Sequence, residues 1–270
     1  MKKIPVRQIN TQRFTLRKLE GLMTGKEMQH AMHRHDFYFI LAVKKGKGTH
    51  EIDFEKFTVT DNTVFFLRPG QVHQLQLKAG ASGYILEFSP DFYQPLRKVR
   101  NTNFYGLDKD RFEKMLRLLL IMHCELQEKQ EAYLDAIRAS LDIFFIEFLR
   151  QRSGEHKTQK VLPYVQDRLE EFLELVELNS SENKQVSWYT DRMNLSAYQL
   201  NEITKVTLGK TSSEIINNHI LLEAKRYLLA TASQVKEIAD LLGYEDISYF
   251  IRFFKKHTGY TPDAFRNKSA

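Results

Sequence analysis

The sequence predicts an α+β protein of two domains, in which a sheet-rich N-terminal domain precedes an all-helical C-terminal domain. Residues 1–95 hold short apolar segments separated by glycine, proline and asparagine turns, which is typical of strands. Residues 108–150 and 161–270 change to helical periodicity. In addition, one helical pattern near the C-terminus occurs twice, about fifty residues apart. At 270 residues the chain is long enough for two hydrophobic cores.

Five strands are expected in the N-terminal domain. They are residues 37–43, 49–54, 64–67, 73–77 and 84–88. Turn signals such as Gly46, Asn62 and Gly70 separate them. Many short strands with such punctuation predict a β-barrel or β-sandwich over about residues 1–95.

Two helices with wide apolar faces are expected within residues 108–150. Their stripes are Phe112, Met115, Leu116, Leu119, Leu120 and Met122, and Leu134, Ile137, Leu141, Phe144, Phe145 and Phe148. Such faces need a cover. They pack on the barrel, form a dimer seam, or do both. The polar segment 153–160 is the predicted linker between an effector-sensing and dimerisation domain, residues 1–152, and a DNA-binding domain, residues 161–270.

The repeated pattern predicts two helix-turn-helix motifs. Ser196-Ala-Tyr-Gln-Leu200, Lys205 and Gly209-Lys-Thr211 recur as Asp246-Ile-Ser-Tyr-Phe250, Lys255 and Gly259-Tyr-Thr261. A short amphipathic helix precedes each copy, over residues 186–193 and 235–242. Helix, tight turn and capped second helix define a helix-turn-helix, whose second helix enters the major groove of DNA.

Exposed positions of the two second helices are the candidate DNA contacts. They are Ala197, Tyr198, Asn201, Glu202, Lys205, Ile247, Ser248, Tyr249, Arg252, Lys255 and Lys256. Asn201 suits adenine, Glu202 suits cytosine, and Arg252 suits a base or a phosphate. Packing roles for Tyr198 and Tyr249, and plain solvation of Glu202, remain alternatives.

Charge supports this surface only locally. Residues 184–270 carry 12 Lys and Arg against 9 Asp and Glu, a net charge of +3. The expected phosphate-binding footprint consists of Arg252, Lys255, Lys256, Arg266 and Lys268.

The second copy carries Ile238-Ala-Asp-Leu-Leu-Gly-Tyr244, Ser248-Tyr-Phe250 and Gly259-Tyr-Thr-Pro262. On these motifs, residues 160–267 resemble the double helix-turn-helix domain of the AraC/XylS family of bacterial transcription regulators. The resemblance implies sequence-specific binding to double-stranded DNA, and contact with RNA polymerase where such a protein activates transcription. The first copy departs from the family, because Glu202 and Thr204 stand where an arginine and an aromatic residue are common. It either tunes specificity or leaves the second copy dominant.

Histidines mark the predicted barrel. Met32-His-Arg-His35 and Arg68-Pro-Gly-Gln-Val-His73 resemble the two motifs of the cupin barrel, which AraC-type regulators often carry for effector sensing and dimerisation. The candidate effector-binding residues are His33, His35, Phe37, Phe39, Phe66 and His73. This composition favours a small organic effector with an acidic or hydroxyl group. Metal cupins add a glutamate where apolar residues around Phe39 stand here. The resemblance therefore implies a pocket without metal or cofactor.

Other functions remain open. One is a cupin-type metal-dependent enzyme with an accessory helical domain, since three imidazoles can bind a metal. Others are a barrel that only dimerises and a protein-interaction module without DNA contact. No further catalytic constellation is recognisable, so a regulator and not an enzyme is expected, as a homodimer. No run of about 18 apolar residues occurs, the N-terminus lacks a signal-peptide pattern, and Cys124 is the single cysteine. A cytoplasmic protein without membrane contact is expected.

Overall fold

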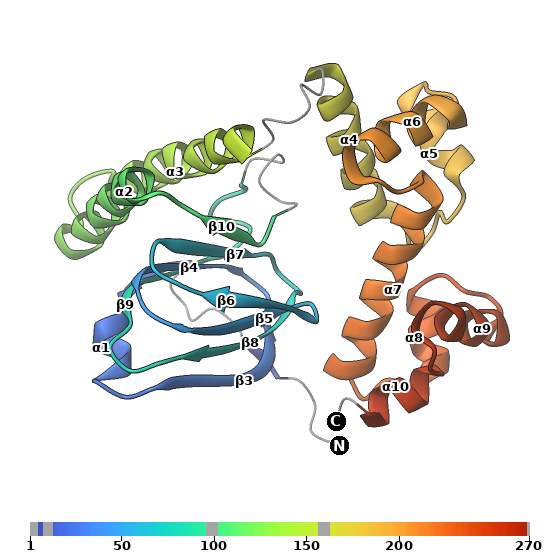
Figure 1. Ribbon diagram of the computed structural model, residues 1–270, viewed down its shortest axis with the longest axis horizontal. Coiled ribbons are helices and arrows are strands. Elements are labelled where there is room, and N and C mark those ends of the chain that lie inside the picture. The colour runs from blue at the N-terminus through green and yellow to red at the C-terminus, as the bar shows by residue number, and fades with distance from the viewer. Residues whose placement is uncertain (1–4, 8–12, 96–101, 156–162, 269–270) are drawn as a thin grey trace. The chain divides into compact units, whose positions relative to one another are not determined.

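The computed structural model describes residues 5–7, 13–95, 102–155 and 163–268 (Figure 1). The chain divides into two compact units, Pro5–Lys157 and Thr158 onward. No helix in these described ranges is long and apolar enough to cross a membrane.

The N-terminal unit contains two five-stranded sheets. One sheet has the order β1-β3-β8-β5-β6 and the other the order β10-β7-β4-β9-β2. The strands are β1 (Val6–Arg7), β2 (Phe14–Lys18), β3 (Met28–His35), β4 (Tyr38–Lys45), β5 (Gly48–Ile52), β6 (Glu55–Val59), β7 (Thr63–Leu67), β8 (Val72–Leu77), β9 (Ser82–Phe88) and β10 (Phe104–Gly106). A short helix, α1 (Leu19–Met23), follows β2. The five predicted strands correspond to β4, β5, β7, β8 and β9, and the other five escaped prediction.

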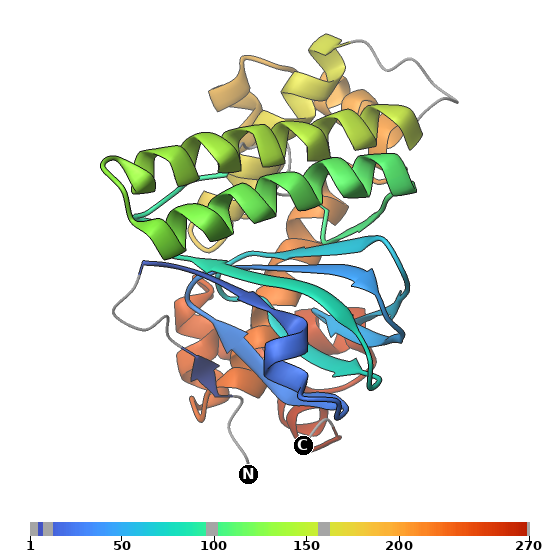
Figure 2. The same cartoon turned by 90° about the vertical axis from the view of Figure 1, so that its left-hand side faces the viewer.

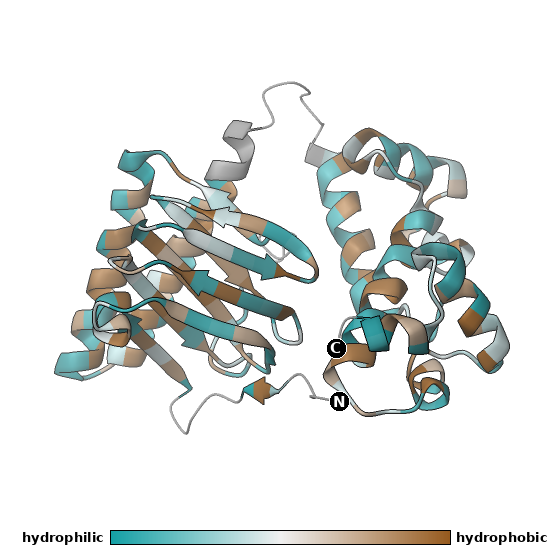
Figure 3. Ribbon diagram, turned by 60° about the horizontal axis from the view of Figure 1, so that its bottom comes forward, coloured by the Kyte–Doolittle hydropathy of each residue, from teal (hydrophilic) through white to brown (hydrophobic). Residues whose placement is uncertain are grey.

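Burial on both faces explains why strand β4 is apolar at every position from Tyr38 to Val43, before its two exposed lysines. Phe39, Leu41 and Val43 belong to the core between the two sheets. Tyr38, Ile40 and Ala42 belong to a second core on the opposite face of the same sheet. Successive side chains of a strand point to opposite faces, so a strand buried on both faces loses its polar alternation. Strand β7 is likewise buried at every position, whereas other strands show alternating hydrophilic and hydrophobic bands (Figure 3).

Helices α2 (Lys109–Glu128) and α3 (Tyr133–Glu155) lie side by side across the outer face of the second sheet (Figure 2). Phe112, Leu119, Phe144 and Phe148 are among the residues that they bury there, so the predicted packing on the barrel is confirmed. Leu120 is an exception, because 45% of it is exposed. Helix α3 extends to Glu155, so residues 153–155 of the predicted linker are helical. Residues 156–160 of that linker lie outside the described residues.

The described residues of the C-terminal unit form helices joined by turns and short loops, without strands. Its helices are α4 (Pro163–Asn179), α5 (Val186–Met193), α6 (Ala197–Leu208), α7 (Ser212–Ala230), α8 (Val235–Leu241), α9 (Ile247–Thr258) and α10 (Pro262–Lys268). Helices α5–α6 and α8–α9 are the two predicted helix-turn-helix motifs, and α7 joins them. One core of buried residues includes Leu200, Ile216, Ile238 and Phe250. Thr211 caps α7, accepting a hydrogen bond from the amide of Glu214.

The turns of the two motifs use the left-handed backbone region. Asn194 ends α5 with φ of 52°, and Gly243 follows α8 with φ of 67°. Gly243 is also tightly enclosed, because a Cβ atom there would lie 1.8 Å from the carbonyl oxygen of Ser181. Lys184 completes this contact by donating hydrogen bonds of 2.7 Å to the carbonyl oxygens of Ser181 and Gly243. Its ammonium also lies 4.6 Å from the ring centroid of Tyr244. The α4–α5 loop is thereby tied to the second turn.

Gly243→Ala should destabilise the helical unit by about 3 kcal/mol, because left-handed strain and overpacking both apply. Gly259→Ala is the matched control. Its φ is 79°, but a Cβ atom added there would meet no atom within 4 Å, so strain alone should cost about 1 kcal/mol. Urea denaturation followed by Trp188 fluorescence measures both, since Trp188 is the only tryptophan. Equal losses in the two variants would contradict the enclosure of Gly243.

Candidate DNA interface and effector pocket

Helix α9 separates a buried face from a basic exposed face. The Asp246 carboxylate caps it by accepting from the amide of Ser248 at 2.7 Å. Phe250 and Phe254 are fully buried. The predicted contacts Ser248, Tyr249, Arg252, Lys255 and Lys256 are all exposed, whereas Ile247 is half-buried against the core. Burying the phenylalanines therefore turns the basic residues outward.

Arg252 is one of the exposed cations of this face, with Lys255 and Lys256. Its guanidinium lies 3.8 Å from the carboxylate of Asp246, and 69% of its side chain is exposed. Exposed ion pairs of this length contribute little stability. The guanidinium is therefore available to a phosphate or a base edge.

The predicted phosphate footprint is smaller than expected. Arg266 donates to the carbonyl oxygens of Leu228 at 2.9 Å and Ser233 at 2.6 Å. It thus binds carbonyl groups at and just beyond the C-terminus of α7, where helical hydrogen bonding ends. Lys268 donates to the Tyr260 hydroxyl at 2.7 Å and lowers the pKa of Tyr260. The inclusion of Arg266 in the phosphate-binding footprint was wrong, because the fold uses its guanidinium; Lys268 stays exposed, and Arg252, Lys255, Lys256 and Lys268 remain candidates.

Helix α6 presents the first motif. Ser196 and Gln199 form a capping box at its start, and Leu200 and Ile203 are buried. Four predicted contacts are exposed, namely Ala197, Tyr198, Glu202 and Lys205. Thr204 is fully buried and donates to the carbonyl oxygen of Asn201.

Asn201 does not face outward, and that expectation was wrong. Its Oδ1 accepts hydrogen bonds of 2.9 Å from both the amide and the hydroxyl of Ser212. A bidentate pair with adenine would require the same oxygen. Asn201 instead secures the N-terminus of α7 against α6.

A cluster of buried histidines lies between the two sheets. His33, His35 and His73 offer ring nitrogens that all lie within 4.8 Å of one another. The Nε2 atoms of His35 and His73 are 2.7 Å apart. The His35 ring also contacts Phe37 and Phe39, with centroids 4.3 Å and 5.2 Å away. Five of the six predicted effector residues are therefore neighbours.

The sixth, Phe66, was assigned wrongly. Its ring lies 5.2 Å from that of Phe145, in the core beneath α2 and α3. Phe65 points into the barrel instead, with its ring 4.7 Å from His50. Since β7 is buried on both faces, its sequence alone does not indicate which side chain points inward.

His50 is a member of the cluster that escaped prediction from the sequence. It is fully buried, and its Nε2 lies 2.9 Å from Nδ1 of His73. Alternation along β5 was a usable signal, because it places His50 on the same face as buried Ile52.

Burial keeps these histidines neutral. Desolvation lowers the pKa of His33 to about 4 and that of His35 and His50 to about 3, and it also lowers the pKa of His73. The positive charge of Arg7 and mutual repulsion among the histidines act in the same direction. Each ring therefore offers one N–H donor and one bare nitrogen near neutral pH.

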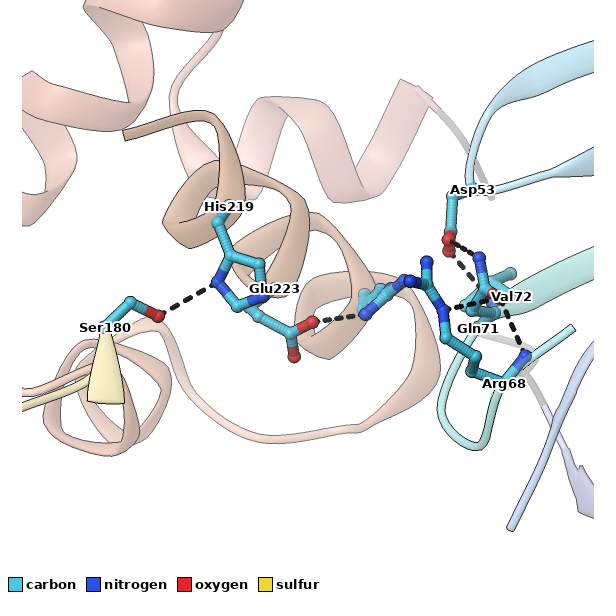
Figure 4. Close-up of polar contacts among 8 residues, drawn as sticks. Asp53, Arg68, Gln71, Val72, Ser180, His219 and Glu223 are labelled. Carbon is cyan, nitrogen blue, oxygen red and sulfur yellow. Dashed lines mark hydrogen bonds and ion pairs between the residues drawn. The ribbon is translucent and has the colours of Figure 1, made fainter. Parts of the chain in front are cut away.

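The loop before β8 is fixed by hydrogen bonds within itself and to Asp53 in the turn between β5 and β6 (Figure 4). Gln71 donates to the Asp53 carboxylate at 2.6 Å and accepts from the amide of Arg68 at 2.8 Å. The same carboxylate accepts from the amide of Val72 at 3.1 Å. These bonds fix the backbone directly before His73.

A cavity of about 410 Å³ adjoins the cluster. Its lining includes Arg7, Arg17, Glu87, His30, His35 and Phe39. Arg17 and Glu87 form an ion pair of 2.8 Å. Of the predicted effector residues, His35 and Phe39 reach this cavity, whereas His33, Phe37 and His73 do not line it. The volume suits a small organic ligand.

Comparisons with known proteins agree with this organisation. Residues 23–138 match the AraC-like ligand binding domain, and residues 189–268 match a helix-turn-helix domain. The HTH-type transcriptional activator RhaS of Escherichia coli (strain SMS-3-5 / SECEC) is 24% identical over 247 residues, which cover 87% of this chain and 86% of RhaS. The uncharacterized HTH-type transcriptional regulator YfiF of Bacillus subtilis (strain 168) is 22% identical over 258 residues, covering 87% and 78%. Among solved structures, fatty acid-bound ToxT of Vibrio cholerae strain SCE256 is 15% identical, with a TM-score of 0.44 over 96% of each chain.

Acidification should destabilise the N-terminal unit. Between pH 6.5 and about 3, the unfolded chain protonates His35 and His50 while the folded chain does not. As the pH is lowered through this window, the free energy of unfolding therefore decreases by about 1.4 kcal/mol per pH unit for each such proton. Hydrogen exchange of the β4 and β9 amides at pH 7.5 and 5.5, corrected for intrinsic exchange rates, measures the free energy of unfolding at the two pH values. His50→Gln should reduce the fall, and a rise on acidification would contradict the assignment.

Asn201→Ala should lower the stability of the helical unit by about 1 kcal/mol, because α7 loses a capping acceptor. Its preferred DNA sequence should stay unchanged. Glu202→Gln is the contrasting variant. It should leave the stability unchanged and alter the preferred DNA sequence. Thermal unfolding and a selection from random DNA distinguish the two roles, and an altered sequence preference in Asn201→Ala would show that Asn201 reads bases.

Proposed function

Because the chain belongs to the AraC/XylS family of transcription regulators, we propose that α6 and α9 read two adjacent major-groove segments of its promoters. The observation that supports this proposal most directly is the exposed face of α9. It presents Tyr249, Arg252, Lys255 and Lys256, while the opposite face of the helix is buried in the core. Recognition helices that enter successive grooves lie about 34 Å apart. The expected site therefore has two half-elements about 10 base pairs apart.

We further propose that a small organic molecule with an acidic or hydroxyl group controls this binding. The cavity beside His35 supports the proposal, since Arg7 and Arg17 offer positive charge and Phe39 an aromatic wall. An effector shifts the equilibrium only if it binds two conformations with different affinity. Saturating effector should therefore change promoter affinity or transcription.

Homodimerisation is proposed through the outer surface of α2 and α3. Leu120, Ile121, Ile143 and Ile146 are 37–49% exposed there, and exposed apolar patches often mark interfaces. RNA polymerase is the proposed partner where the protein activates transcription. The cytoplasm, where bacterial DNA resides, is its proposed location.

Selection of bound fragments from genomic DNA, at near-physiological salt, tests the regulator function. Recovery of a motif with two half-elements supports it, and the neighbouring genes then suggest effectors. Only sequence-independent binding, with and without those effectors, would contradict it.

Arg252→Ala should weaken binding to the selected promoter by about 1–3 kcal/mol, or roughly 5- to 150-fold. Lys47→Ala removes one positive charge from an exposed position between β4 and β5, away from α2 and α3, and should leave affinity unchanged. Fluorescence anisotropy with promoter and scrambled DNA measures both variants. Equal affinity of Arg252→Ala and the unaltered protein would favour a protein-interaction module.

A further inference from the structure

We propose that His33, His35 and His73 form a binding site for a divalent transition-metal ion of the zinc, cobalt or nickel class. The three side chains are buried, and one ring nitrogen from each lies within 4.8 Å of the other two. Imidazole is a favoured ligand of these metals, whereas magnesium and calcium require oxygen ligands. The sequence-based expectation of a metal-free pocket rested on the missing glutamate, which a three-histidine site does not require.

The distances fit such a site after small rotations of the rings. Zinc–nitrogen bonds of about 2.0–2.1 Å place tetrahedral ligand nitrogens about 3.3 Å apart. The Nε2 atoms of His35 and His73 are slightly closer than this, at 2.7 Å. The widest separation in the cluster is somewhat longer, at no more than 4.8 Å.

Hydrogen bonds at the outer ring nitrogens orient two of the three ligands. His33 donates from Nδ1 to the carbonyl oxygen of Ala31 at 2.7 Å, which leaves Nε2 with a lone pair. That Nε2 is buried and has no hydrogen-bond partner among the described residues. Donation from Nδ1 of His73 to Nε2 of His50, at 2.9 Å, leaves a lone pair on the His73 Nε2, which accepts from the His35 Nε2 at 2.7 Å. A bound metal ion would take the place of this shared proton. Metal-binding histidines commonly use their second nitrogen like this.

The cluster also has an accessible side. His35 belongs both to the cluster and to the wall of the 410 Å³ cavity. Three protein ligands leave a fourth coordination position open, and an oxygen of a cavity-bound molecule suits it. This last step rests on the proposed effector function, whereas metal binding itself does not.

Titration with Co²⁺ tests the site in the full-length chain, without an affinity tag and after treatment with chelator. The expected result is one Co²⁺ per chain, with visible absorption bands from nitrogen ligands. His33→Gln and His35→Gln should each weaken binding at least 100-fold. His50→Gln, which keeps all three ligands, should weaken it about 10- to 100-fold through lost orientation. His257→Gln removes an exposed histidine of α9 and should bind like the unaltered protein.

Two results would overturn the site. One is the absence of stoichiometric Co²⁺ binding by the folded, unaltered chain, and the other is binding that survives both His33→Gln and His35→Gln. Zn²⁺ should also raise the Tm of the unaltered chain but not that of His33→Gln, which guards against variants that merely misfold. Promoter affinity is measured on the same samples. Sequence-specific DNA binding without Co²⁺ binding rejects the metal site alone, and the reverse result rejects the regulator alone.

Discussion

Burial of the second sheet on both faces is the constraint on which the N-terminal unit depends. Leu41 faces the barrel interior while Ile40, next to it, faces α2 and α3. Each fully buried aliphatic or aromatic side chain contributes about 1.5–3 kcal/mol. A sheet this apolar is stable only when covered, so α2 and α3 are part of the barrel's structure and not an appendage. Their remaining exposed apolar positions are the ones through which homodimerisation is proposed.

The helical unit also depends on apolar burial, but here polar side chains bind the ends of the helices. Its two motifs bury aromatic and aliphatic residues around α7, and polar side chains satisfy the helix ends. Asn201 binds the start of α7 and Arg266 binds carbonyl groups at and just beyond its end. Polar residues used in this way hold the recognition helices in place. Those left unused by the fold, above all Arg252 and Lys255, are exposed on α9 and form the surface proposed to contact DNA.

Much of this organisation could be predicted from the sequence because local rules decide it. Capping residues such as Ser196 and Asp246, the glycine stops, and the helical stripes act within a few positions of each other. The repeat then identified the motifs. Half of the strands were missed where the local pattern is weak, as in β3, whose residues are mostly polar or half-buried.

The errors at the sites have a common physical origin, which is competition from partners distant in sequence. Ser212 takes the oxygen of Asn201, and Leu228 and Ser233 take the guanidinium of Arg266. None of these three partners can be recognised from helical periodicity. Phe66 was misassigned for a related reason, since its neighbour Phe65 is equally apolar and only the three-dimensional position of α3 decides between them.

The histidine cluster lowers the stability of the fold. His33 Nε2, His35 Nδ1 and His50 Nδ1 are buried without hydrogen-bond partners among the described residues. Each unsatisfied buried polar group costs about 1–3 kcal/mol. A barrel that served only as a dimerisation scaffold would gain stability from apolar residues at these positions. Retaining neutral imidazoles there, beside a cavity and with ring orientations fixed by Ala31 and His50, is the arrangement expected of a site that recovers this cost when it binds.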